Sequence, residues 1–186
     1  MLIPANTFAS RLDPPEWGTD SEDRSIRAAH AYKLLHAVKT PPGTNSDGTI
    51  DEAKLRKWIV ETRQLCATHG REETGDLMIG ELLSDSPVGS DDIWPHEAVR
   101  QVLEEVGTAN IAQGMSIGRY NARGAHWVDP SGKEERTLAS QYRGWSKKLA
   151  FDAPFIAKML EDLAKSYDRE ADQNVERQRL ERRVDP

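Results

Sequence analysis

The spacing of apolar residues along this chain predicts helices throughout. In the clearest segment, apolar side chains recur at three- and four-residue steps, which places them on one face of a helix. These residues are Leu55, Trp58, Ile59, Leu65 and Cys66. Asp51 stands at the expected N-cap, and Gly70 stands where the chain would leave the helix. No run of alternating β-branched residues occurs, so the predicted fold class is all-α.

The same spacing in the rest of the chain predicts an irregular bundle of about six or seven helices, closed by a C-terminal helical hairpin. The predicted helices cover about 22–39, 51–69, 74–84, 95–106, 109–121 and 133–149, and a long last one begins at residue 154. Pro95 is expected at the first position of its helix. Gly114 and Gly118 either weaken their helix or allow another backbone to approach closely.

Three regions follow from this pattern. Residues 1–20 are expected to be an extended lead-in, because three prolines block regular structure there. Residues 21–170 form one helical domain, with a subdivision allowed near 107–132, and residues 171–186 are a charged, solvated helix end or tail. The lead-in carries several large apolar side chains, so we expect it to lie against the body or against a partner.

Composition narrows the classes of protein that fit. The 186 residues carry 31 acids and 25 bases, a net charge of −6, which excludes a uniformly basic nucleic-acid binder. The single cysteine excludes an intramolecular disulfide framework and a cysteine-based zinc finger. Neither a membrane-length apolar stretch nor a signal-peptide pattern occurs. We therefore expect a cytoplasmic protein with no membrane, metal or cofactor requirement.

Charge is unevenly distributed along the chain. Residues 72–105 contain ten acids and one base, Arg100, whereas residues 106–150 contain seven bases and three acids. Three interpretations remain open at this stage. Both segments are solvated surfaces, or they attract each other within the fold, or one meets a partner: a basic protein for the acidic segment, phosphate for the basic one.

The segment from Gly118 to Trp127, GRYNARGAHW, is the most unusual local stretch. Its guanidinium groups can grip a carboxylate or phosphate through two parallel hydrogen bonds, and its aromatic rings can stack on a base or on a guanidinium. The alternative is a structural network, in which Asn121 caps its helix and Arg123 pairs with Glu134 or Glu135. The candidate binding residues are Arg119, Asn121, Arg123, His126, Glu135, Arg136 and Arg143.

Three stretches of the sequence resemble the C-terminal region of large, uncharacterised bacterial multidomain proteins. They are DDIWPHEAVRQVLEE, GMSIGRYNARGAHW and EERTLASQYRGWSKKL. The resemblance covers roughly residues 30–170, and such motif matches need structural context. It implies a helical module that normally ends a longer chain, and it brings no known catalytic residue.

Three functional hypotheses follow. The first is a non-catalytic helical interaction or scaffolding module of a larger bacterial assembly, bound to a protein partner or to a second copy of itself. The second is binding of a nucleic-acid phosphate backbone through the basic 119–148 region. The third is an enzyme with a polar site around Asn121, Arg123, His126 and Glu135, which requires these residues to converge in a cleft.

Overall fold

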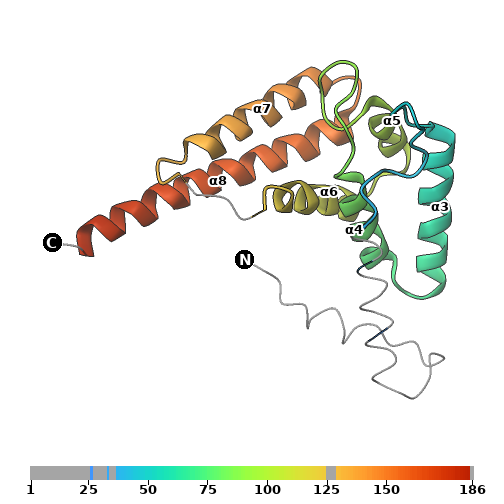
Figure 1. Ribbon diagram of the computed structural model, residues 1–186, viewed down its shortest axis with the longest axis horizontal. Helices are drawn as coiled ribbons and strands as arrows, with labels where there is room; N and C mark the ends of the chain where they lie inside the picture. The colour runs from blue at the N-terminus through green and yellow to red at the C-terminus, as the bar shows by residue number, and fades with distance from the viewer. Residues whose placement is uncertain (1–25, 27–32, 34–36, 125–128, 185–186) are drawn as a thin grey trace.

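The computed structural model describes residues 26, 33, 37–124 and 129–184, and over these residues it contains six α-helices and no strand (Figure 1). The all-α prediction is therefore confirmed. The predicted lead-in, 1–20, and most of the predicted helix 22–39 lie outside the described residues. The helices, labelled as in Figure 1, are α3 (Glu52–Thr68), α4 (Glu72–Leu83), α5 (Glu97–Val106), α6 (Ala109–Asn121), α7 (Lys133–Leu149) and α8 (Pro154–Val184).

Helix α3 begins and ends at the predicted signals. The Asp51 carboxylate accepts a hydrogen bond from the backbone N–H of Lys54 at 3.0 Å, which satisfies a free amide of the first turn. At the other end Gly70 takes the left-handed conformation, with φ +64°. The apolar stripe is buried at Leu55 and Ile59, whereas Leu65 near the C-terminal end is 63% exposed. The stripe therefore packs on the core only along the first half of the helix.

Helix α5 begins two residues later than the sequence predicts. Pro95 is not its first residue, because His96 is the N-cap and its Nδ1 accepts a hydrogen bond from the Ala98 N–H at 3.1 Å. The preceding loop is fixed by Arg100, the single base of the acidic segment. Its buried guanidinium donates to the carbonyl oxygens of Ile93 at 3.0 Å and Pro95 at 2.9 Å.

Helices α4 and α6 cross at glycines, so their backbones touch. A Cβ atom added at Gly80 would lie 2.8 Å from the Met115 nitrogen, and one added at Gly114 would lie 2.9 Å from the Leu77 carbonyl carbon. Real Cβ atoms do not approach backbone atoms so closely. Of the two alternatives for Gly114, close approach of another backbone is the one that the structure shows.

Helices α7 and α8 form the predicted antiparallel hairpin, which lies along one side of the molecule in Figure 1. The rest of the fold holds this hairpin through α5 and α6. At its closed end, the Glu104 carboxylate of α5 accepts the N–H groups of Phe155 at 3.1 Å and Ile156 at 3.0 Å. An acidic side chain of one helix thus caps the start of another.

Helix α8 is much longer than its neighbour, with 31 residues against 17 in α7. Gly132, directly before α7, packs against Ala171. Asp172 still pairs with Arg136 of α7 and Asn174 is buried, whereas the C-terminal end of α8 extends beyond the start of α7, as Figure 1 shows. We name residues 172–184 the α8 arm. At 1.5 Å per residue the arm is about 20 Å long.

Candidate functional site

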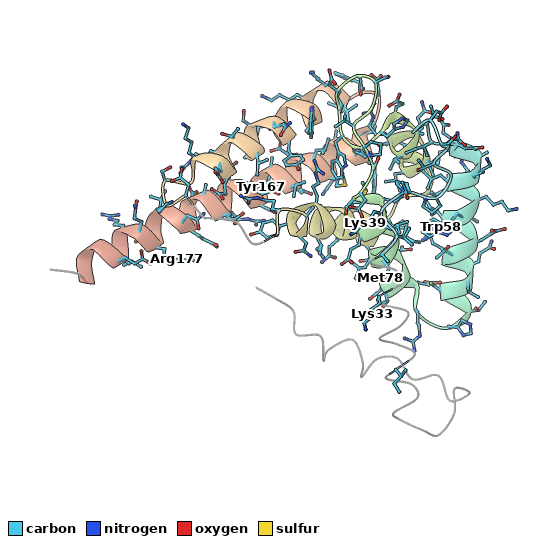
Figure 2. All side chains as sticks on the ribbon, viewed as in Figure 1. Lys33, Lys39, Trp58, Met78, Tyr167 and Arg177 are labelled. Atoms are coloured by element: carbon cyan, nitrogen blue, oxygen red, sulfur yellow. The ribbon has the colours of Figure 1, made fainter. Side chains whose placement is uncertain are left out.

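Aromatic rings from three helices and one loop form a contiguous stack between α6 and the hairpin. Tyr142 of α7 and Tyr167 of α8 lie parallel, with ring centroids 5.6 Å apart and an interplanar angle of 2°. Tyr120 of α6 stacks on Tyr167 at 5.8 Å, and Trp94 meets Tyr142 edge-on at 6.3 Å. Figure 2 labels Tyr167, near the middle of α8. The stack joins α6 and the loop before α5 to the hairpin.

Two of the predicted arginines of α6 and its C-terminal turn cover this stack. The Arg119 guanidinium lies 5.1 Å from the centroid of the Trp94 ring, and its Nε donates to the Tyr142 hydroxyl at 3.1 Å. Arg123 lies 5.4 Å from the Tyr167 ring centroid. Cation–π contacts of this kind gain strength when water is excluded. Both arginines face inward and hold α6 against the hairpin.

Arg123 also bridges two carboxylates of the hairpin. Its Nη2 donates to Glu135 Oε1 at 3.1 Å, and its Nη1 donates to Glu170 Oε2 at 3.4 Å. The Glu135 side chain is fully buried, and the Arg123 side chain is 15% exposed. Burial opposes the charge on Arg123, but the hydrogen bond to Glu135 and the charge of Glu170 outweigh it and raise the Arg123 pKa. The guanidinium is thus committed to internal partners.

The same surroundings hold the nearby phenols neutral. Burial raises the pKa of Tyr167 above its ordinary value. Burial also raises the pKa of Tyr120, and its hydrogen bond to Glu170 acts in the same direction. A general base at pH 7 needs a pKa near that value, so neither tyrosine suits proton abstraction.

Two polar atoms of this cluster are buried without a hydrogen-bond partner. They are Oε2 of Glu135 and Nε1 of Trp94. An unmatched buried polar atom costs about 1 to 3 kcal/mol. Neither residue lines the hollow along α7 or the one beside Asn121 that are described below. The cluster therefore holds helices together, and its chemistry is that of a buried ion-pair network.

Two other predicted arginines belong to α7 and pair with α8. Arg143 donates to Asp168 at 2.6 Å and lies 3.6 Å from Glu161. Arg136 donates to Asp172 at 3.1 Å and to the Ser131 carbonyl oxygen. All four predicted candidate arginines therefore have partners within this chain.

Asn121 lies apart from the buried cluster. It is exposed and lines a hollow of 160 Å³ between the C-terminal ends of α4 and α6, together with Met78 and Asp85. His126 lies outside the described residues. Of the four residues in the enzyme hypothesis, the structure brings together Arg123 and Glu135, and it places Asn121 elsewhere.

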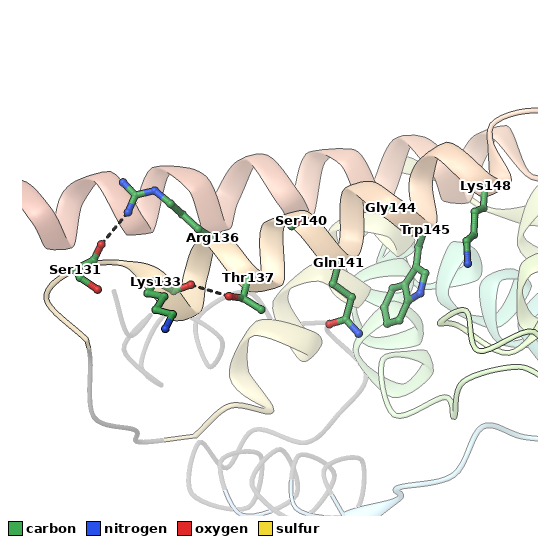
Figure 3. A pocket seen from close by; sticks show the side chains of 9 residues that line it. All are labelled: Ser131, Lys133, Arg136, Thr137, Ser140, Gln141, Gly144, Trp145 and Lys148. Carbon is green, nitrogen blue, oxygen red and sulfur yellow. Dashed lines mark hydrogen bonds between the residues drawn. The ribbon is translucent and has the colours of Figure 1, made fainter.

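A larger, open hollow of 780 Å³ runs along α7 (Figure 3). All its described lining residues belong to α7 or to Ser131 just before it, so the described part of the chain forms one wall of this hollow. Figure 3 shows the side chains of Lys133, Gln141 and Trp145 directed into the same space. The full lining set is Ser131, Lys133, Arg136, Thr137, Ser140, Gln141, Gly144, Trp145 and Lys148.

Sequence reasoning missed Tyr167 and Glu170 as members of the cluster. Tyr167 follows Leu160 and Leu163 at helical spacing and so predicts only an apolar face of the last helix, and Glu170 falls among many charges there. Helical spacing places both on α8, but it gives no indication that α6 approaches that part of the helix. No local signal in the sequence identifies Glu170 as a partner of Arg123.

No group of three or more histidine, cysteine, aspartate or glutamate side chains that could hold a metal ion occurs among the described residues. None of the described helices is both long and apolar enough to cross a membrane. Comparison of the chain with protein-family models, with curated proteins and with solved structures finds no match.

Proposed function

We propose that this protein is a non-catalytic helical interaction or scaffolding module that docks onto another macromolecule through the α8 arm. The observation that carries this proposal is the projection of the arm beyond the hairpin (Figure 1). Of the ten arm residues whose side chains are described, 172–181, eight are exposed. They include Val175 and Leu180, which is 51% exposed.

A helix with so little packing gains little from tertiary contacts. Isolated helices of this length are marginal in water, and most helical stability in proteins comes from an apolar face packed on a core. The arm persists because it continues a packed helix, which removes the cost of nucleation. A docking role explains why the helix continues beyond the core that stabilises it.

The two alternative hypotheses have less support. Binding of phosphate through the 119–148 region loses Arg119, Arg123 and Arg143, which pair with groups of this chain. It would depend on exposed cations such as Lys147 and Lys148. An enzyme requires its polar residues to line a shared cleft, and Asn121 lies apart from the Arg123–Glu135 pair. The interaction module requires neither arrangement.

The test compares the full chain with a variant that ends at Ala171. Both are purified through an N-terminal tag from cells that produce the protein naturally, and co-purified protein and nucleic acid are identified. We expect a stoichiometric macromolecule with the full chain and none with the shortened chain. Equal thermal unfolding of the two proteins shows that the body is intact. Recovery of the same molecules with both proteins would refute a docking role for the arm.

A further inference from the structure

Two exposed arginines on the described part of the α8 arm, Arg177 and Arg179, have little internal pairing. The exposed Arg177, labelled in Figure 2, forms no ion pair with another described residue. Arg179 is 64% exposed, and its one ion pair, with Glu176, is long at 3.9 Å. The sequence adds Arg182 and Arg183. Residues 177–183 therefore hold four arginines and one acid, and the whole arm holds four arginines and three acids. The arginines of α6 and α7 are paired internally, whereas Arg177 and Arg179 are exposed and available to a ligand.

The arm's composition suits a polyanion better than the groove of another protein. A helix that docks in a protein groove presents a continuous apolar stripe, at i, i+3, i+4 and i+7. In the arm the exposed large apolar residues are Val175 and Leu180, which are five residues apart and therefore lie on opposite faces. Arginine presents a planar fork of donors that matches phosphate oxygens. An arginine-rich helix of this kind can contact phosphates on both sides.

Size and charge distribution point to duplex DNA among the polyanions. A helix with its side chains is about 10 to 12 Å across, and the major groove of B-form DNA is about 12 Å wide. The other part of the molecule is acidic, because residues 39–105 carry fourteen acids and seven bases. DNA repels that part and attracts the arm, so the molecule approaches with the arm leading.

We propose that the α8 arm binds duplex DNA, by contact of its arginines with backbone phosphates and by entry of the helix into the major groove. This inference rests on the proposed docking role of the arm and names the partner class. Because the contacts are to phosphate, binding is independent of base sequence and weakens steeply with salt. Up to four phosphate contacts give a slope of log K on log salt of about −3 to −4.

The test measures anisotropy of a labelled duplex of mixed sequence while the full chain is titrated, from about 50 to about 200 mM salt. Two double variants remove the same charge at opposite ends of the hairpin. Arg177→Gln/Arg179→Gln changes the arm, and Lys147→Gln/Lys148→Gln changes the last turn of α7. Each lowers the net charge by two, so a general electrostatic effect is the same in both. The four altered side chains are exposed, and thermal unfolding checks that both variants remain folded.

We expect the arm variant to make the salt slope shallower by about 2 and to weaken binding at least about tenfold at low salt. The α7 variant should keep the wild-type slope. The proposal is overturned if the wild-type chain does not bind the duplex at low salt, or if both variants weaken binding equally. It is also overturned if polyglutamate competes as well as unlabelled duplex, because the arm would then recognise carboxylates. Arm-dependent capture of a protein without DNA binding would refute this inference and leave the docking role standing.

Discussion

Replacing Gly114 with alanine should destabilise the protein, although alanine is the better helix former. The new Cβ would overlap the carbonyl group of Leu77, whose carbon it would approach to 2.9 Å, and would lie 3.0 Å from the Glu81 nitrogen. Both groups are backbone, so no side chain can rotate away and α4 must move from α6. Overpacking of this kind costs about 1 to 3 kcal/mol, and more where the backbone is displaced.

The helix preference of alanine offsets part of this cost. Alanine is favoured over glycine by up to about 1 kcal/mol in a helix interior. We therefore expect Gly114→Ala to lower the free energy of unfolding by a net amount of about 2 kcal/mol. For a chain of this size that corresponds to a fall of about 4 to 8 °C in Tm. Urea titration followed by circular dichroism measures the difference.

Gly144 provides the matched control. It lies within α7, and a Cβ there would have no neighbour within 4 Å. Gly144→Ala should therefore gain about 0.5 to 1 kcal/mol from helix propensity alone. The two substitutions are chemically identical and should change stability in opposite directions. If Gly114→Ala is as stabilising as Gly144→Ala, the close contact between α4 and α6 is not present in solution.

Three further predictions test the buried polar contacts. Arg123→Gln leaves the buried Glu135 carboxylate without its cation, so urea titration should show that the free energy of unfolding falls by about 3 to 5 kcal/mol. Wild-type stability for that variant would contradict the buried ion pair. Adding Glu135→Gln to it should recover most of any lost stability. Arg100→Leu removes the donor of the Pro95 carbonyl oxygen, while the Ile93 oxygen keeps its bond from the Gly89 N–H at 2.9 Å. The change should cost about 1 to 3 kcal/mol in the same assay, and an unchanged midpoint would mean that the loop does not depend on this guanidinium. Burial raises the pKa of Tyr167. Above the ordinary tyrosine pKa of about 10, the unfolded chain therefore binds fewer protons than the folded chain. The free energy of unfolding then falls as the pH rises. Tyr167→Phe should reduce this fall in Tm between about pH 9 and 11, and parallel curves for the two proteins would refute the assignment.

The sequence predicted most of the helices because their signals are local. Asp51 caps α3, the bounds of α6 and α7 agree with the predicted 109–121 and 133–149, and α8 begins at Pro154. Capping, glycine and proline signals and apolar spacing all act within about one or two turns of a helix. The start of α5 was mispredicted because a histidine side chain supplies the cap there, and histidine is not among the usual N-cap residues.

The candidate site could be predicted only in part. The sequence predicted the pairing of Arg123 with Glu134 or Glu135 in its structural interpretation of this segment, since Arg123 and Glu135 lie only twelve residues apart across a single turn region. It could not find Glu170, which is forty-seven residues from Arg123 and lies on a helix with many other charges. It also suggested the arginines of α6 and α7 as phosphate ligands, because a count of charges does not show whether a side chain points toward the core or toward the solvent.

What the sequence by itself determined is the helical class, the position of the hairpin and the uneven charge. What only the tertiary structure decided is which charges are free. Helical spacing fixes the relation of residues three or four apart, and that relation is the same in any packing. Whether Arg123 meets Glu170 depends on how α6 and the hairpin meet, through contacts between residues distant in the chain. How much of α8 extends beyond α7 also depends on such contacts. Burial then commits the inner arginines to internal partners, because an unpaired charge there is costly, while Arg177 and Arg179 stay in water.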